Sequence, residues 1–167
     1  MTPPSHRAFV DGLLADLTGE ARRHYRDRLV SLVVFGSMGR GTPRADSDLD
    51  LLVVADGLPD GRRARMEDFA VIERALQPRL AAGRAAGFAT ECSPVFKTPE
   101  EAQAGSPLFL DMVDDARILH DRDGFFAATL NRLRARLARL GARRVWRGNA
   151  WYWDLKPDYR PGEVFEL

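Results

Sequence analysis

The chain has 167 residues, with 25 basic and 24 acidic side chains and a formal net charge of +1. A composition of 45% hydrophobic and 29% charged residues is typical of a soluble globular domain and excludes a disordered chain. The single cysteine, Cys92, excludes an intramolecular disulfide, and no apolar run approaches the roughly 20 residues that span a bilayer. We therefore expect a cytoplasmic protein without a membrane partner.

The first third of the chain predicts one helix and two buried strands. Residues 6–27 carry apolar side chains at helical spacing, and Ser5 can cap the helix that they predict. Residues 29–35 and 49–54 are short apolar runs typical of buried strands. Between them, residues 36–47 are rich in Gly, Ser, Pro and charge, which predicts a loop or a short helical turn.

The middle of the chain predicts a second helix and a third strand. Residues 57–61 form a predicted turn, and a helical pattern follows over residues 62–82. We expect Pro78 to kink or break this helix, because proline removes a backbone donor. Residues 88–97 predict a third strand, which Pro94 assigns to the sheet edge or interrupts.

The last third predicts helices and an extended tail. We expect one or two short helices over 99–115, a short extended piece over 117–120 and a long helix over 124–140. Gly141 is a natural stop for that helix, and the aromatic tail 145–167 predicts irregular or extended structure. Helices that alternate with strands indicate an α/β or α+β fold.

Two carboxylates open the second predicted strand. Asp48 and Asp50 are two residues apart, so on a strand they point to the same face. Two adjacent carboxylates repel each other, and they need a cation at the start of an otherwise apolar strand. Mg²⁺ prefers oxygen ligands and usually completes its shell with substrate phosphates. The pair therefore predicts a metal site.

A glycine-rich segment precedes the two carboxylates. Gly36, Ser37 and Gly39 allow backbone N–H groups to approach an anion closely, and Arg40 and Arg44 can add positive charge. A metal site beside a phosphate-binding loop indicates metal-assisted phosphoryl or nucleotidyl transfer.

The same residues carry a family resemblance. They resemble the signature of the polymerase-β-type nucleotidyltransferase superfamily, in its minimal nucleotidyltransferase branch, through Gly36-Ser37, Arg40-Gly41 and Ser47-Asp48-Leu49-Asp50-Leu51. The resemblance implies a nucleotidyltransferase fold, with a small mixed β-sheet flanked by helices, over residues 1–120. We expect residues 121–167, the C-terminal helix and aromatic-rich tail, to pack on the same domain.

The resemblance also implies roles for individual residues. Asp48 and Asp50 would be catalytic and would ligate two Mg²⁺ ions that hold ATP or another nucleoside triphosphate. The residues expected to bind the nucleotide itself are Gly36, Ser37, Arg40 and Ser47.

A third carboxylate is expected from the neighbouring strand, and Glu91 is the best match. Phe88, Cys92 and Phe96 share an apolar stripe on that strand, so Glu91 points to the other face. It would complete the metal site and help to deprotonate the acceptor.

The predicted activity is Mg²⁺-dependent transfer of a nucleoside monophosphate, AMP in the favoured version, to an acceptor hydroxyl. The resemblance implies two settings. One is an antitoxin that adenylylates a tyrosine of a partner HEPN-domain toxin, and the short chain favours it. The alternative is modification of a small molecule, as in aminoglycoside nucleotidyltransferases. A different class of function is a non-catalytic module that binds a nucleotide or a partner.

Two further features have open interpretations. Residues 132–147 contain seven arginines and no acid, which indicates either the solvated face of a helix or a patch for RNA or an acidic partner. The tail contains Trp146, Trp151, Trp153 and further aromatic residues, which could close the core, contact a partner or stack bases. We do not favour nucleic acid as a partner.

Overall fold

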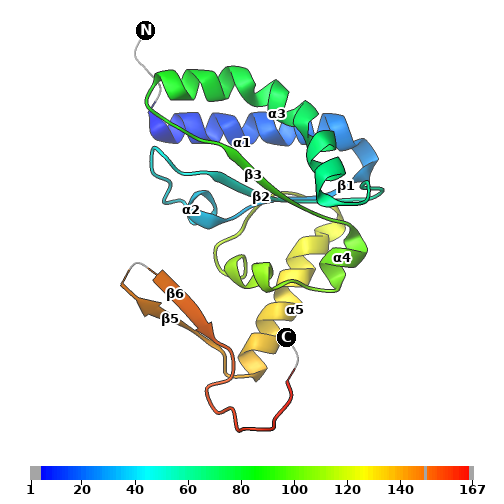
Figure 1. Cartoon of the computed structure of the whole chain (residues 1–167), viewed down its shortest axis with the longest axis vertical. Helices are drawn as coiled ribbons and strands as arrows, with labels where there is room; N and C mark the ends of the chain where they lie inside the picture. Colours follow the sequence, from blue (N-terminus) through cyan, green and yellow to red (C-terminus); the bar gives the residue numbers. More distant parts are fainter. Residues whose placement is uncertain (1–4, 149, 166–167) are drawn as a thin grey trace.

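The computed structural model describes residues 5–148 and 150–165. Its centre is a four-stranded sheet in the order β3-β2-β1-β4 (Figure 1). The strands are β1 (Leu29–Val34), β2 (Leu49–Ala55), β3 (Cys92–Lys97) and β4 (Arg117–Asp121). Strands β2 and β4 run antiparallel to β1, whereas β3 runs parallel to β2. The sheet is therefore mixed, as predicted.

Two long helices, α1 (His6–Tyr25) and α3 (Arg62–Ala85), lie side by side over one face of the sheet (Figure 1). Helix α1 begins where the Ser5 hydroxyl accepts a hydrogen bond from the backbone N–H of Ala8. The apolar stripes of both helices bury against the odd-numbered residues of β2. This first core cluster includes Leu13, Leu17, Phe69, Leu76, Leu51 and Val53.

The other face of the sheet is covered by α4 (Pro99–Gln103), the 3₁₀ turn η2 (Pro107–Asp111) and α5 (Phe125–Arg139). The even-numbered residues of β2 point to this face. The second core cluster includes Val33, Leu52, Val54, Phe109, Phe126 and Leu130. The predicted class, α+β with a small mixed sheet flanked by helices, is confirmed.

The connections around the sheet are short. The 3₁₀ turn η1 (Arg26–Arg28) leads into β1, the single turn α2 (Gly36–Gly39) follows it, and η3 (Arg122–Gly124) leads into α5. After α5, strands β5 (Arg143–Arg147) and β6 (Ala150–Asp154) form a separate antiparallel hairpin. Within the described ranges, no helix is both long and apolar enough to cross a bilayer.

Three expectations are refined by the structure. Pro78 does not break α3, which continues through it to Ala85, but Figure 1 shows that α3 bends, which fits the expected kink. The third strand begins at Cys92 rather than at residue 88, because its ladder with β2 starts where the N–H of Leu49 donates to the carbonyl of Glu91. The tail is more regular than expected, since it contains the β5–β6 hairpin.

Other expectations are confirmed. Strand β3 is at the sheet edge, which explains why it tolerates Pro94. Helix α5 ends at Arg139, and Gly141 adopts a positive φ of 67° just beyond it. Cys92 is partly buried in β3, and burial together with the nearby charge of Glu73 raises the pKa of its thiol to about 12.

Candidate active site

The glycine turn is held against the start of β2. Strand β1 ends at Val34, and the backbone N–H of Phe35 then donates to the carbonyl of Asp50 at 3.0 Å. Gly36 follows with a φ of +64°, a conformation that other residues rarely adopt. A Cβ atom added at Gly36 would collide with the Oδ2 atom of Asp50. The turn and the carboxylate are therefore in direct contact, and only glycine fits between them.

The other end of the turn is equally close to its neighbours. A Cβ atom at Gly39 would collide with the backbone carbonyl oxygens of Asp115 and Val34. The first N–H groups of a helical turn have no partner within it, so they can face an anion. Ser37 is half-buried in this turn, and its carbonyl accepts a hydrogen bond from the N–H of Thr42.

The two aspartates lie close together on the sheet face that also carries Leu52 and Val54. Asp48 is exposed, whereas Asp50 is half-buried between the fully buried Leu49 and Leu51. Burial raises the pKa of Asp50, the negative charge of Asp48 raises it further, and the positive charge of Arg40 lowers it. The negative charge of Asp48 thus disfavours the charged form of Asp50, and a bound cation would offset that effect.

The donor set suits Mg²⁺, which prefers carboxylate oxygens and keeps positions for water and phosphate. Over residues 5–148 and 150–165, no group of three His, Cys, Asp or Glu side chains is arranged to hold a metal ion. The assignment of Asp48 and Asp50 as metal ligands stays a prediction.

Glu91 lies next to the acid pair in register. Parallel pairing places Leu49 beside Cys92 and Asp50 beside Ser93, so Glu91 is level with Asp48. The side chain of Val95 packs in the second core cluster, and alternation places Glu91 on that same face. Glu91 is exposed and precedes the strand by one residue. Its role as a third carboxylate stays a prediction.

Ser47, a predicted nucleotide contact, closes a turn in the loop before β2. Its hydroxyl accepts a hydrogen bond from the N–H of Arg44 at 2.8 Å, and its own N–H donates to the carbonyl of Arg44. Ser47 thus positions the loop that leads into Asp48.

Arg40 connects the aspartates to a charged cluster that the sequence did not reveal. Its Nη1 atom lies 3.8 Å from Oδ2 of Asp115, and Nη2 of Arg144 lies 2.5 Å from the same oxygen. Asp111 is also in this cluster: burial raises its pKa, and the charges of Arg144 and Arg40 oppose the shift. These residues are far apart in the sequence, and no local motif marks them.

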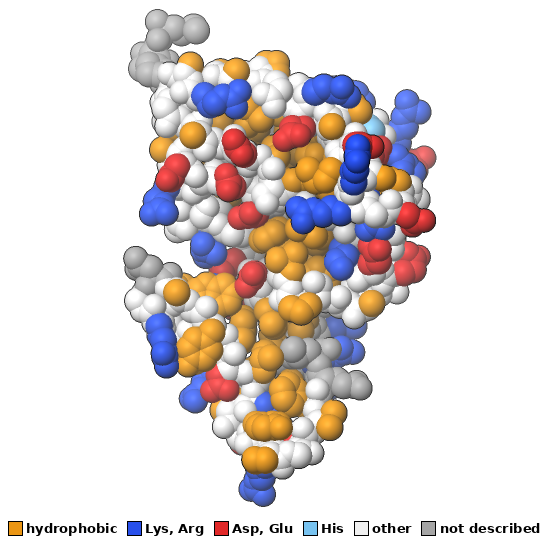
Figure 2. Space-filling model, in the orientation of Figure 1, with side chains coloured by type: hydrophobic (Ala, Val, Ile, Leu, Met, Phe, Trp, Pro, Cys, Tyr) orange, Lys and Arg blue, Asp and Glu red, His pale blue; other side chains and the backbone are white. Residues whose placement is uncertain are grey.

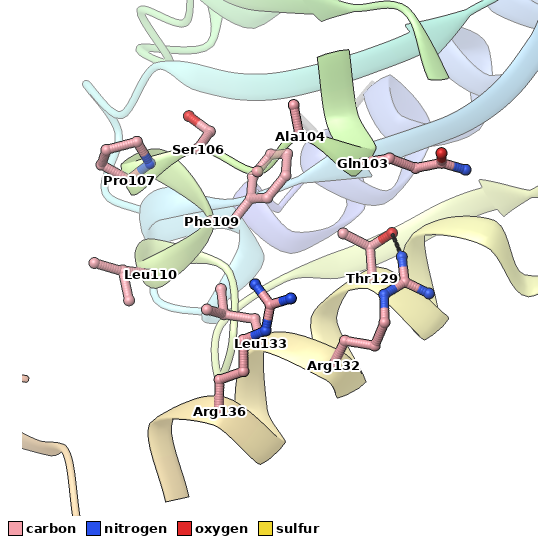
Figure 3. Close-up of a pocket in the computed structure, with 11 residues that line it drawn as sticks. Gln103, Ala104, Ser106, Pro107, Phe109, Leu110, Thr129, Arg132, Leu133 and Arg136 are labelled. Atoms are coloured by element: carbon pink, nitrogen blue, oxygen red, sulfur yellow. Dashed lines mark hydrogen bonds between the residues drawn. The ribbon is translucent and has the colours of Figure 1, made fainter. Parts of the chain in front are cut away.

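A separate cavity of about 280 Å³ lies between the η2 region and α5 (Figure 3). Phe109, Leu110 and Leu133 line it together with Arg132 and Arg136. Arg132 donates a hydrogen bond to the hydroxyl of Thr129 at 3.0 Å. None of the predicted site residues lines this cavity, which is positively charged rather than acidic.

Part of the chain matches a known domain family. Residues 16–94, which include the glycine turn and both aspartates, match the nucleotidyltransferase domain family. The chain is 28% identical over 134 residues to a Methanocaldococcus jannaschii protein named as a protein adenylyltransferase. That match covers 79% of this chain and 86% of the relative.

A second relative is much longer. It is the bifunctional uridylyltransferase/uridylyl-removing enzyme of Streptomyces coelicolor, which is 42% identical over 69 residues. That match covers 40% of this chain and 8% of the relative.

Among solved structures, a toxin–antitoxin complex with AMP-PNP is similar at a TM-score of 0.46 and 20% identity. The match covers 74% of this chain and 92% of the other. A variant of the MntA-HpeT toxin–antitoxin complex has the same TM-score and coverage at 18% identity. The matched domain and the adenylyltransferase relative both support a nucleotidyltransferase activity, as the sequence predicted.

Proposed function

We propose that the protein transfers AMP from ATP to a tyrosine hydroxyl of a partner protein, a helical HEPN-domain toxin that this modification neutralises. The observation that carries the proposal is the contact between Gly36 and the Asp50 carboxylate. It joins a phosphate-binding turn to a metal-binding acid pair within one small site.

In the proposed reaction the acceptor oxygen attacks the α-phosphorus of ATP. A new bond forms between that phosphorus and the acceptor oxygen, the bond from the α-phosphorus to the bridging oxygen breaks, and pyrophosphate leaves. When bound, Mg²⁺ neutralises charge on the attacking and leaving oxygens. Asp48 and Asp50 would hold two such ions, and Glu91 would accept the proton of the acceptor hydroxyl.

The glycine turn offers a binding site for the phosphate groups. Backbone N–H groups at the start of the turn, from Gly36 to Met38, would face the triphosphate, and the Ser37 hydroxyl adds a donor. Arg40 is exposed and lies within reach of both Asp115 and Asp50, so it can shift its charge toward a bound phosphate. Ser47 supports the loop from which Asp48 projects.

One observation supports a protein acceptor. The relative that shares most of its length with this chain is named as a protein adenylyltransferase.

We propose residues 1–120 as the nucleotidyltransferase domain and residues 121–167 as an extension packed on it. Phe126 and Leu130 of α5 support the packing of this extension, because they bury in the same cluster as Leu52 of the sheet.

The test is incubation of the protein with ATP labelled on the α-phosphate, Mg²⁺ and the product of the neighbouring gene. We expect the label on a tyrosine of an all-helical partner, and no transfer when EDTA replaces Mg²⁺. Label on a small molecule with none on protein would contradict the acceptor. Binding of ATP without any transfer would favour a non-catalytic module.

A further inference from the structure

The chain has three tryptophans, and all of them lie on the C-terminal hairpin. The register pairs Trp146 with Trp151 and Arg144 with Trp153. Directly opposed residues of an antiparallel ladder point to the same face, and residues two apart on one strand do so too. One face of the hairpin therefore carries all three indoles and Arg144, and we call it the tryptophan face. Tyr152 lies on the opposite face.

The tryptophan face is turned toward the rest of the domain. The indole N–H of Trp153 donates to the carbonyl of Leu110 at 3.2 Å. The guanidinium of Arg144 lies 2.5 Å from Oδ2 of Asp115 and 3.9 Å from Oδ2 of Asp114. Only 15% of the Arg144 side chain is exposed, so this contact is largely shielded from water. These contacts hold the hairpin beside residues 110–115.

The same residues connect the hairpin to the glycine turn. The carbonyl oxygen of Asp115 packs against Gly39, and its carboxylate is shared by Arg144 and Arg40. The Arg144 guanidinium carbon lies 3.9 Å from the ring centroid of Trp151 and 5.0 Å from that of Trp146. The indoles are thus separated from the phosphate-binding turn by only the Arg144–Asp115 pair.

Trp146 remains 57% exposed although it points to the inward face. Figure 2 shows a notch between the hairpin and the part of the molecule above it, with acidic and basic atoms at its inner end. An exposed indole offers a flat surface to a second ring. Aromatic side chains near arginine commonly stack nucleobases.

We propose that the tryptophan face forms the second wall of the nucleotide site, where Trp146 stacks the base of the nucleoside triphosphate. The triphosphate would lie on the turn from Gly36 to Gly39, as the proposed function requires, and this inference rests on it. In this arrangement the pairing of Arg144 with Asp115 sets the distance between the Trp146 ring, which stacks the base, and the glycine turn, which binds the phosphates. Residues outside the matched nucleotidyltransferase region therefore complete the site.

Tryptophan fluorescence can test this proposal, because all three tryptophans lie on the hairpin and their emission reports on that part of the protein alone. The probes are α,β-methylene ATP, which cannot transfer its nucleotide, and inorganic tripolyphosphate, which has no base; both are added with Mg²⁺. We expect the ATP analogue to quench the emission saturably. Trp146→Leu should weaken binding of the analogue about tenfold in calorimetry and leave the affinity for tripolyphosphate unchanged.

Tyr152→Leu is the matched control, because Tyr152 is an aromatic residue on the opposite face of the same hairpin and is 45% exposed. It should bind both probes like the wild type. Trp146→Phe should recover most of the lost affinity, because a smaller ring can still stack. Circular dichroism and thermal melting establish that each variant is folded.

Three outcomes would overturn the inference. Equal affinity of Trp146→Leu and the wild type for the ATP analogue would show that Trp146 does not stack the base, and it would leave the proposed function intact. If Trp146→Leu binds the analogue normally but transfers AMP to the partner tyrosine more slowly, the indole contacts the acceptor tyrosine rather than the base. If neither probe binds to the wild type, the proposed function is wrong, and so is the proposed stacking of the base on Trp146.

Discussion

The glycine turn with its acid pair and the C-terminal hairpin lie close together but are built differently. The first is formed by residues 36–50, a contiguous segment between two strands whose residues are almost all buried. The second consists of exposed or half-buried residues, and it is held to the domain by contacts such as those of Arg144 and Trp153. The reacting groups come from one contiguous segment next to the buried strands, whereas the hairpin reaches them only through contacts between residues far apart in the sequence.

The largest effect is expected at the acid pair. Asp48→Asn or Asp50→Asn should reduce AMP transfer at least about 1000-fold, because each removes a metal ligand. Thermal melting should show no loss of stability for Asp50→Asn, since the neutral amide no longer repels Asp48. Full transfer activity in a folded Asp48→Asn protein would contradict the assigned chemistry.

The next effect is expected at the glycine turn. Gly36→Ala places a Cβ atom against the Asp50 carboxylate at a φ of +64°, so transfer should fall about 100-fold and the free energy of unfolding by about 1–2 kcal/mol. Gly124→Ala is the matched control, since Gly124 has a φ of +67° and open space around it. It should lose similar stability and keep its activity. Equal activity losses in the two variants would show that backbone strain alone is responsible.

A smaller effect is expected where the hairpin meets the domain. Arg144→Gln leaves the carboxylate of Asp115 without its closest partner, so the free energy of unfolding should fall by about 1–3 kcal/mol. The KM for ATP should rise about fivefold, with kcat changed less. Arg143→Gln serves as the control, because 67% of the Arg143 side chain is exposed and its ion pair with Asp154 is worth little. An unchanged KM for ATP in Arg144→Gln would show that the hairpin does not contribute to nucleotide binding.

The smallest effect concerns an ion pair away from both regions. Hydrogen bonds from Arg65 lower the pKa of Glu101 to about 2. A depressed folded-state pKa stabilises the protein above the unfolded value of about 4.3, and this contribution is lost as the pH falls from there toward 2. Because Glu101 is partly exposed, the contribution is at most about 1 kcal/mol.

Glu101→Gln should therefore melt at a lower temperature than the wild type at pH 7, and the difference should shrink toward pH 2. Glu100→Gln changes an exposed neighbour and should follow the wild type. A melting difference that stays constant from pH 7 to pH 2 would show that the charge of Glu101 is not the cause.

The sequence predicted the contiguous parts of the molecule well, for identifiable reasons. Strands β1 and β2 are apolar runs bounded by turn residues, and both are buried in the sheet centre. Pro78 does not end α3, because its missing N–H is tolerated in a helix that packs against α1. The start of β3 was placed too early because pairing with β2, which only the fold determines, sets where that strand begins.

The hairpin and the charged cluster were harder to predict. A Gly-Asn pair at residues 148–149, between two runs that contain tryptophan, was a signal for a hairpin that we did not use. Asp111, Asp115 and Arg144 meet only because η2 and β5 fold back toward the glycine turn, and nothing in their local sequence indicates it. Asp48, Asp50, Gly36 and Ser37 could be proposed from their spacing alone.

The lone thiol of Cys92 has a practical consequence for work in solution. Burial and the nearby charge of Glu73 raise its pKa to about 12, so very little of it is thiolate at neutral pH, and maleimides and oxidants will react with it slowly. A cysteine introduced at an exposed position can therefore be labelled without replacing the native one. Paired labels on the hairpin and on α3 would report the distance between them as nucleotide and partner are added.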